Sequence, residues 1–256
     1  MTGSAYIRSS KVPQVTLVFW IIKIAATTLG ETGGDALSMT FDLGYALSTA
    51  IFFVFFAGTV AAQIRARSFH PFLYWAVIVA TTTMGTTMAD FADRSLGIGY
   101  TGGSLILFAL VLLVLGVWWK VEGSVSVNSI TSPRVEAFYW VTILFSNTLG
   151  TALGDFLADS GPGYEGGALV FAGMLAVVWA LYAFTGISRT LLFWAAFILT
   201  RPLGATVGDL LTKPVASGGL DLSRITSSAV IAVFIIACIL ILPQRAGGHP
   251  GAKSSA

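Results

Sequence analysis

The sequence predicts an all-α integral membrane protein with eight transmembrane helices, arranged as four parallel two-helix repeats in two pseudo-symmetric halves. Of its 256 residues, 55% are hydrophobic and only 10% are charged, whereas a soluble domain carries about 25% charged residues. The hydrophobic residues also form eight long blocks, each near the ~20 residues needed to cross a bilayer. A soluble helical protein is disfavoured, because these blocks are too long and too numerous.

The eight expected helices follow one another along the whole chain. Their approximate bounds are 14–33, 43–62, 71–91, 101–119, 135–156, 166–184, 190–211 and 225–242. The longest cytoplasmic connection, EGSVSVNSITSPR, separates the two expected halves, residues 1–125 and 126–256. The first block is not interpreted as a cleaved signal peptide, because GETGGDALSMT after it lacks a small-x-small cleavage site followed by a soluble mature domain.

The odd-numbered blocks share one motif, W-x9-G-x4-D, in which an aromatic residue precedes the tryptophan. The four matches are Phe19-Trp20, Gly30 and Asp35; Tyr74-Trp75, Gly85 and Asp90; Tyr139-Trp140, Gly150 and Asp155; and Phe193-Trp194, Gly204 and Asp209. Chance does not place four such matches at one phase of four hydrophobic blocks, so we interpret them as an internal repeat.

The even-numbered blocks are plainly apolar and follow short glycine-rich loops. GYALS, GYTGGS and GYEGGA mark these loops in the first three repeats, and GGLDLS stands in the fourth. Because each repeat crosses the membrane twice, all four enter it in the same direction, and the repeat aspartates are expected at one depth. An unbroken helix places each aspartate about 22 Å beyond its tryptophan. We therefore expect an aromatic belt at the cytoplasmic interface and the aspartates in the outer half of the membrane.

The basic residues predict the orientation. With eight spans both termini lie on one side, and most of the 14 lysine and arginine residues fall there. They are Arg8, Lys11, Arg65, Arg67, Lys120, Arg134, Arg189, Arg245 and Lys253. The positive-inside rule then places both termini in the cytoplasm. A net charge of +2 makes no case for nucleic acid, so the expected partners are the lipid bilayer and a small cation, with the oligomeric state left open.

The repeat aspartates are candidate ligands for a cation, although they are also open to interpretation as solvated residues at the membrane boundary. Boundary residues vary in type and position, whereas these are fixed four times. Arg94 follows Asp90 by four residues, and Lys213 follows Asp209 by four, so each base shares a helix face with an acid and can pair with it. In repeats 2 and 4 the negative charge of the aspartate is therefore interpreted as neutralised by the base.

Repeats 1 and 3 are interpreted as acidic and opposite each other in the ring. Neither Asp35 nor Asp155 has a base four residues later, and Glu31 and Asp159 add to their negative charge. The expected cation site consists mainly of Asp35, Glu31 and Asp155. Asp90, Asp209 and Asp159 complete the set of candidate metal ligands.

Two bases, Lys23 and Arg201, fall within predicted spans, where ionisable residues are costly and functional by default. Lys23, Thr27 and Glu31 share a face at i, i+4 and i+8. Two interpretations stay open for both bases. Each either bridges to an acid on another helix, or acts as a tethered counter-charge that occupies the acidic site when substrate is absent. Arg94 and Lys213 complete the set of candidate counter-charges.

A small polar run follows each tryptophan and supplies candidate path-lining residues. They are Thr27, Thr28, Thr83, Asn147 and Thr148. Such hydroxyls often bond only to their own backbone, but hard cations also take oxygen ligands of this kind. Cys238 is the only cysteine and both histidines lie outside the spans, so neither a thiolate site nor an imidazole-rich zinc site is expected.

The repeat resembles a family of bacterial integral membrane proteins built from units of about 55 residues, usually four in number and of unknown function. The closest stretches are KVPQVTLVFWIIKIAATTLGETGGD and GDLLTKPVASGGLDL, and the resemblance runs from about Lys11 to Leu242. It implies an eight-span protein of the bacterial inner membrane and supplies no substrate. The short motifs GETGGD and GDLLTK are also similar to acid–glycine motifs of manganese and calcium exchangers.

These features predict a secondary transporter, not an enzyme, with no cofactor. The first hypothesis is a divalent-cation transporter, with Mn²⁺ as the best single choice, that exports the ion in exchange for protons. The second is a proton-coupled transporter of a small organic molecule whose pocket the aromatic residues line. The third is an intramembrane aspartyl enzyme, because LGD at Asp155 is similar to a protease motif, but the matching partner motif is missing.

Overall fold

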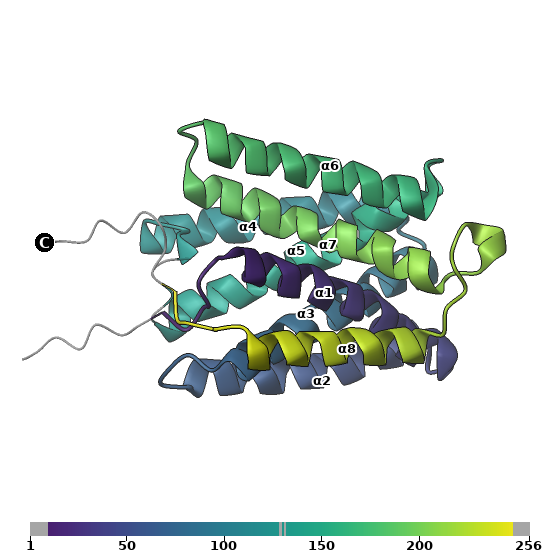
Figure 1. Ribbon diagram of the computed structural model, residues 1–256, viewed down its shortest axis with the longest axis horizontal. Helices are drawn as coiled ribbons and strands as arrows, with labels where there is room; N and C mark the ends of the chain where they lie inside the picture. Colours follow the sequence, from purple (N-terminus) through teal and green to yellow (C-terminus); the bar gives the residue numbers. More distant parts are fainter. Residues whose placement is uncertain (1–9, 128–129, 131, 248–256) are drawn as a thin grey trace, which may run out of the picture.

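The computed structural model describes residues 10–127, 130 and 132–247, so Arg8 and Lys253 of the basic set lie outside it. This part of the chain holds eight long helices and no strand (Figure 1). The helices are α1 (Leu17–Asp35), α2 (Gly44–Arg65), α3 (Pro71–Asp90), α4 (Tyr100–Glu122), α5 (Pro133–Asp159), α6 (Gly163–Phe184), α7 (Arg189–Thr212) and α8 (Arg224–Ile241). All except α1 are long and apolar enough to cross a membrane. The predicted all-α fold is confirmed.

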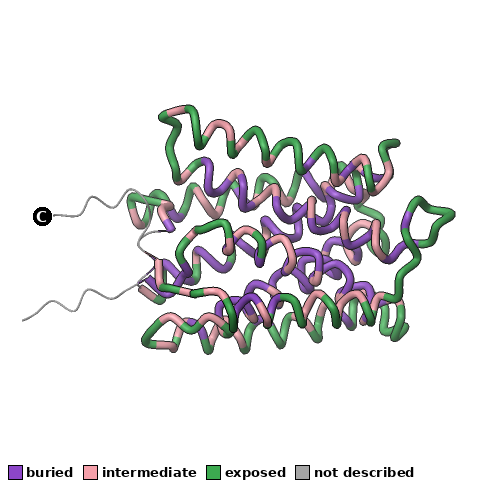
Figure 2. Tube along the Cα trace, viewed as in Figure 1, coloured by how far each residue is buried: buried purple, intermediate pink, exposed green. Residues whose placement is uncertain are grey.

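The odd-numbered helices form an inner ring and the even-numbered helices surround it. Helices α3, α5 and α7 are largely buried, whereas α2, α4, α6 and α8 are mostly exposed (Figure 2). Helix α1 also belongs to the ring, because it packs between α3 and α7, as α5 does on the opposite side. The polar motif residues explain this division, since polar side chains within a membrane face the bundle interior and helices that are apolar all round suit the lipid.

The repeats interlock in a closed circle. The outer helix of each repeat packs against the inner helix of the next, so α2 packs on α3, α4 on α5 and α6 on α7. Helix α8 closes the circle by packing on α1. The halves 1–125 and 126–256 therefore meet along two seams, one between α3 and α5 and one between α7 and α1.

The repeat glycines lie where neighbouring inner helices cross. A Cβ atom would lie 2.4 Å from Thr82 at Gly30, 3.1 Å from Thr148 at Gly85, 2.4 Å from Arg201 at Gly150 and 2.2 Å from Thr27 at Gly204. Real Cβ atoms do not come within 3.0 Å of other heavy atoms, so at three of these crossings a side chain would force the backbones apart. Small residues allow such close helix packing in membranes.

The expected aromatic belt at the membrane interface is wrong. Trp75, Trp140 and Trp194 are buried, at 1%, 1% and 4% exposure. The repeat aromatic residues instead stack around the inside of the ring, in the contacts Phe19–Trp75, Tyr74–Trp140, Tyr139–Trp194 and Phe193–Trp20, with ring centroids 5.5–6.2 Å apart. The physical reason is that the outer helices provide the lipid-facing surface, so each inner helix packs its indole against the Phe or Tyr ring of a neighbouring inner helix. This aromatic ring closes the inner bundle near the chain termini.

The inner helices remain α-helical through their repeat glycines as far as the aspartates. After Asp35 and Asp90 the backbone widens into the π-helical turns η1 (Ala36–Thr40) and η2 (Phe91–Ser95), and after α7 comes the 3-10 turn η4 (Val215–Ser217). Gly44 and Gly163 are the first residues of α2 and α6, Gly99 directly precedes α4, and Gly218 lies in the loop before α8. Their φ angles of 70°, 67°, 74° and 85° favour glycine. This explains why a glycine recurs at or before the start of each outer helix.

Candidate cation site

The repeat aspartates lie at the ends of the inner helices that are remote from the chain termini, and all are buried. Asp35, Asp90, Asp155 and Asp209 are exposed by 0%, 3%, 5% and 2%. A charge in such a setting requires a partner, because an isolated buried carboxylate loses its hydration without compensation. The partners of the four carboxylates therefore define the site.

Lys213 bridges repeats 4 and 1. Its Nζ lies 3.1 Å from Asp209 Oδ1 and 2.7 Å from Asp35 Oδ2, and Arg224 Nε lies 3.7 Å from the same Asp35 oxygen. Burial lowers the pKa of Lys213, but Asp209 and Asp35 raise it by more, so the pKa lies above the ordinary value and the ammonium stays charged. The expected pair with Asp209 is therefore present, and Asp35 shares the same base.

Arg94 bridges repeats 2 and 3 in the same way. Its Nε lies 2.8 Å from Asp90 Oδ1, as the four-residue spacing predicts, and its Nη2 lies 3.4 Å from Asp155 Oδ2. The interpretation of repeats 1 and 3 as lacking a base is therefore wrong. The base comes from the preceding repeat around the circle, which the spacing within a single helix does not reveal.

Three carboxylates form the closest acidic group among the described residues. Glu31, Asp35 and Asp209 each offer an oxygen, and these oxygens lie within 4.8 Å of one another. Asp35 Oδ1 is buried and has no hydrogen-bond partner in the described part of the chain. We call these three residues the carboxylate trio. The expected grouping of Asp35 and Glu31 with Asp155 differs from this arrangement, because Asp155 lies with Arg94, and Asp159 is exposed at the end of α5.

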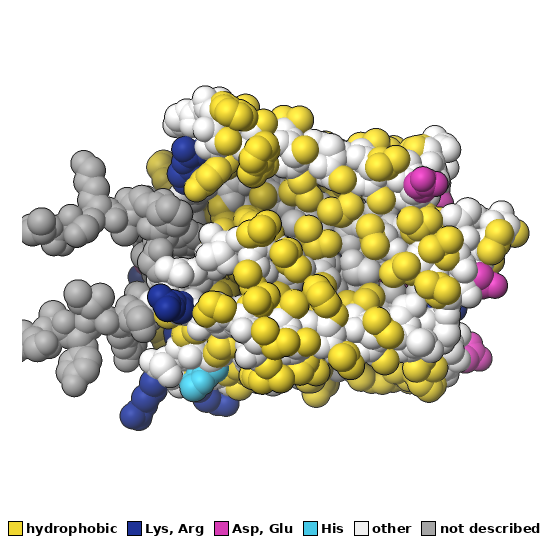
Figure 3. Space-filling model, in the orientation of Figure 1, with side chains coloured by type: hydrophobic (Ala, Val, Ile, Leu, Met, Phe, Trp, Pro, Cys, Tyr) yellow, Lys and Arg dark blue, Asp and Glu magenta, His cyan; other side chains and the backbone are white. Residues whose placement is uncertain are grey.

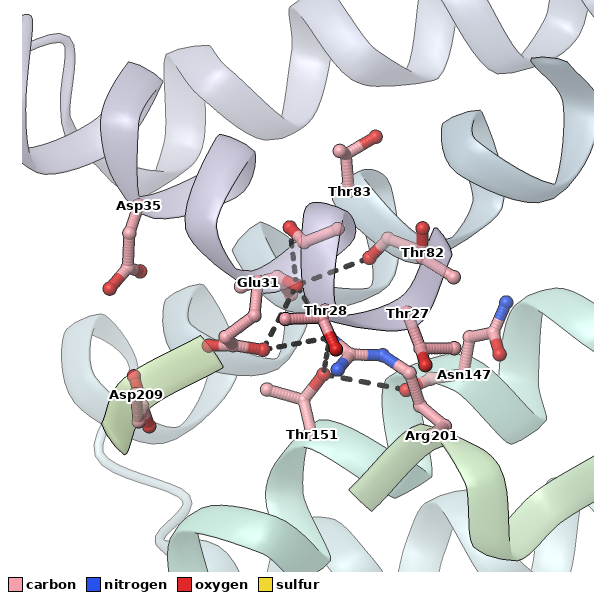
Figure 4. A network of polar contacts seen from close by, with 12 residues as sticks. Thr27, Thr28, Glu31, Asp35, Thr82, Thr83, Asn147, Thr151, Arg201 and Asp209 are labelled. Atoms are coloured by element: carbon pink, nitrogen blue, oxygen red, sulfur yellow. Dashed lines mark hydrogen bonds and ion pairs between the residues drawn. The ribbon is translucent and has the colours of Figure 1, made fainter. Parts of the chain in front are cut away.

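Arg201 forms a polar hub next to the trio. Its Nη2 lies 2.9 Å from Glu31 Oε2, 2.5 Å from Thr86 Oγ1 and 2.6 Å from Thr151 Oγ1. In Figure 4, Glu31 lies between this hub on one side and Asp35 and Asp209 on the other. Arg201 thus bridges to an acid on another helix, which is the first of the two interpretations that the sequence left open.

Thr86 and Thr151 are the residues that sequence reasoning missed. Both stand eleven residues after their repeat tryptophan, at the position that Glu31 occupies in repeat 1. Equivalent positions of a pseudo-symmetric ring face the same axis, so a comparison of the repeats at this position would have identified them.

Lys23 lies apart from the carboxylates. Its Nζ is fully buried, 4.2 Å from the centre of the Phe197 ring, and has no hydrogen-bond partner among the residues that the structure describes. Lys213, and not Lys23, is therefore the lysine that contacts the acidic group.

The expected path-lining hydroxyls bond mainly to backbone carbonyls. Thr28, Thr83 and Thr148 donate to the carbonyl oxygens of Ile24, Val79 and Leu144, four residues earlier in their own helices. Thr27 Oγ1 also lies 3.1 Å from the carbonyl oxygen of Thr200 and so joins α1 to α7. Asn147 Nδ2 donates to Thr81 Oγ1 at 3.0 Å and joins α5 to α3. Thr27 and Asn147 therefore join neighbouring inner helices, whereas the other three hydroxyls bond within their own helices.

Comparison with models of protein families finds four matches to one family, described as "Repeat of Unknown Function (DUF347)". The matched residues are 18–69, 73–124, 138–188 and 192–244. Each match spans one inner helix and the outer helix that follows it, which confirms the four-fold repeat. No curated protein and no solved structure matches the chain. The chemistry of the site therefore has to be argued from its own residues.

Proposed function

The chain belongs to the Repeat of Unknown Function family, and we propose that it is a membrane transporter for a divalent metal cation, with Mn²⁺ as first choice. The observation that carries this proposal is the buried carboxylate trio of Glu31, Asp35 and Asp209, whose oxygens lie within 4.8 Å of one another. Hard divalent cations bind carboxylate oxygens. Buried ionisable residues within membrane-spanning segments mark ion pathways.

The position of Lys213 supports a cation as the substrate. Its ammonium group lies between Asp35 Oδ2 and Asp209 Oδ1, where a bound cation would contact the same oxygens. A metal ion entering the trio displaces this ammonium group, and Lys213 reinserts when the ion leaves. Lys213 immediately follows α7 and its side chain is 11% exposed, so it has a short way to water on the side remote from the termini.

Transport requires two barriers to open in turn. The Arg201 hub and the aromatic ring close the bundle on the side of the chain termini, and Lys213 and Arg224 cover the trio on the other side. We propose exchange with protons: when a divalent ion leaves, the Lys213 ammonium group restores one of the two positive charges, and one carboxylate of the trio takes up a proton in place of the other. We propose export as the direction, as the resemblance to manganese and calcium exchangers suggests.

We propose a location in the bacterial inner membrane, as the family resemblance implies, with both termini in the cytoplasm. Figure 3 shows lysine and arginine side chains gathered at the end of the molecule where the termini lie, and acidic side chains at the other end. An excess of lysine and arginine marks cytoplasmic loops. The carboxylate trio then lies toward the outer face of the membrane.

The test is Mn²⁺ efflux from proteoliposomes that carry the purified protein, with an inward proton gradient. Asp35→Asn and Asp209→Asn should each abolish efflux, because the trio loses a charge where charge pairs are much stronger than in water. Asp42→Asn is the matched control, since Asp42 is exposed on the same side of the molecule. Equal efflux from Asp35→Asn, Asp209→Asn and the unmodified protein would refute the site. Parallel assays with Mg²⁺, Ca²⁺, Co²⁺, Ni²⁺ and Zn²⁺ identify the metal.

One observation favours the second hypothesis, a proton-coupled transporter of a small organic molecule. A groove of about 470 Å³ lies between α1, α6 and α7, and Trp20, Trp179, Tyr182 and Phe193 line part of it. Uptake of amphipathic compounds that Ala196→Trp blocks, without any effect on Mn²⁺ efflux, would favour this function. The aspartyl enzyme gains no support, because a base stands within both aspartate pairs, whereas a catalytic dyad shares a proton between two carboxyl groups.

A further inference from the structure

Two cationic side chains in the middle of the inner ring carry donors that the described residues do not satisfy. Lys23 Nζ, Arg201 Nε and Arg201 Nη1 have no hydrogen-bond partner there, and both residues are exposed by 0%. For Lys23 the Phe197 ring, at 4.2 Å, faces the ammonium group. A ring face attracts a cation, but it leaves the remaining N–H groups without an acceptor.

Lys23 and Arg201 stand on the two facing helices of the seam between α1 and α7. Lys23 contacts Phe197, which precedes Arg201 by four residues, or about one helical turn of 5.4 Å, on α7. The hydrogen bond from Thr27 to the Thr200 carbonyl, at 3.1 Å, holds the two helices together between these levels. The donors of Lys23 and Arg201 therefore belong to one region of the interior.

The described residues offer one carboxylate to the two bases of this region. Glu31 is the one carboxylate that contacts either base in the described structure, and it already accepts from Arg201 Nη2. The other polar partners of Arg201, the Thr86 and Thr151 hydroxyls, are neutral. The remaining buried carboxylates of the ring pair with Lys213 and Arg94. An uncompensated buried charge is strongly destabilising, so a negative charge beside Lys23 and Arg201 would stabilise both bases in their charged forms.

We propose that Lys23 and Arg201 bind a small monovalent anion, chloride or a small carboxylate, at the centre of the inner ring. Both bases only donate hydrogen bonds, so the ligand must accept them, and the complete burial of both side chains restricts it to a few atoms. The anion crosslinks α1 to α7, the seam at which the fourth repeat meets the first. This site lies on the terminus-facing side of the carboxylate trio and does not depend on the proposed cation transport.

The experiment is thermal unfolding of the purified full-length protein in sodium chloride, bromide, formate or gluconate at equal ionic strength. Gluconate is too large for the site and serves as the reference. We expect a saturable rise in Tm with chloride or bromide, of about 3 °C for each tenfold increase above the Kd. In Lys23→Met this rise should be lost. Arg189→Gln removes an exposed cation and should leave it intact.

Each result of this experiment either supports the anion site or overturns it. A Tm that is equal in all four salts, or a chloride effect of unchanged size in Lys23→Met, overturns the site, and so does a higher Tm of Lys23→Met in every salt. A rise in formate but not in chloride identifies the ligand as a carboxylate. If Lys23→Met yields no folded protein, crystals of the unmodified protein grown in bromide provide the test. An anomalous peak beside Lys23 and Arg201 supports the site, and its absence overturns it.

Discussion

At the scale of single residues, the site arises where one repeat departs from the others. Seven residues after each repeat tryptophan stand Thr27, Thr82, Asn147 and Arg201. Three of these positions hold small polar side chains, and only the arginine is long enough to reach the next level of the ring. There it contacts Glu31, Thr86 and Thr151, which occupy one equivalent position in repeats 1 to 3. The four repeats place equivalent residues around the ring. Arg201 and Glu31 differ from their equivalents in the other repeats, and they carry the charge of this hub.

Arg201→Met should strongly destabilise the protein, because it leaves Glu31 buried without its charged partner. The cost of removing one member of a buried ion pair is about 3–5 kcal/mol. The double variant Arg201→Met/Glu31→Gln removes both charges and should recover much of that loss. Thermal unfolding and the yield of monodisperse protein measure both effects. A single variant that is as stable as the unmodified protein would show that the pair contributes nothing.

Lys213→Met should make the fold depend on metal. Without the ammonium group, Asp35 and Asp209 repel each other in the absence of metal, so Tm should fall in a chelating buffer. Added Mn²⁺ should then raise Tm by more than it does in the unmodified protein, because the metal ion no longer competes with the ammonium group. The matched control is Lys120→Met, which removes an exposed lysine at the other end of the bundle. An Mn²⁺ response equal to that of the unmodified protein would contradict displacement of Lys213.

At the scale of helices, the repeat glycine sets how closely two inner helices approach. At Gly204 a Cβ atom would lie 2.2 Å from Thr27 Oγ1 and 2.8 Å from the Thr27 backbone carbonyl carbon. The backbone cannot yield as a flexible side chain does, so α1 and α7 must separate if any larger residue stands there. This separation would also strain the contact of Arg201 with Glu31, since the same two helices carry these residues.

Gly204→Ala should therefore lower stability by about 1–3 kcal/mol, the usual cost of overpacking. Gly173→Ala is the matched control, because Gly173 lies in α6 with open space around its Cβ position. There the change should be neutral or slightly stabilising, since alanine favours helices by about 1 kcal/mol over glycine. Thermal unfolding of the two variants side by side measures the difference. Equal effects at both positions would argue against a crossing at Gly204.

At the scale of the whole molecule, the sequence predicts the features that lie within one repeat, but it does not predict the contacts between neighbouring repeats of the closed circle. The eight helices and the pairs Asp90–Arg94 and Asp209–Lys213 follow from periodicity along one chain segment. The second partners of Arg94 and Lys213 depend on which repeat packs next around the circle, as does the burial of the tryptophans. No local pattern specifies a closed order of four inner helices.

In the closed circle all four repeats also run in the same direction. Every loop from an inner helix to an outer helix lies on one side, and every loop between repeats lies on the side of the termini (Figure 1). The positive-inside rule and the basic end of the molecule in Figure 3 support the proposed cytoplasmic location of the termini.

A reporter fused after Ala246 should therefore report cytoplasm, and a reporter inserted at Gly163, the first residue of α6, should report the outside. The matched control is an insertion at Gly186, between α6 and α7, which should report cytoplasm although only one helix separates it from Gly163. Activity of a periplasmic reporter and of a cytoplasmic reporter at each position measures the side. A cytoplasmic signal at Gly163 would contradict this orientation, because helix α6 must cross the membrane between the two insertions. It would also place the carboxylate trio near the cytoplasmic face, so the proposed direction of metal transport would have to be reconsidered.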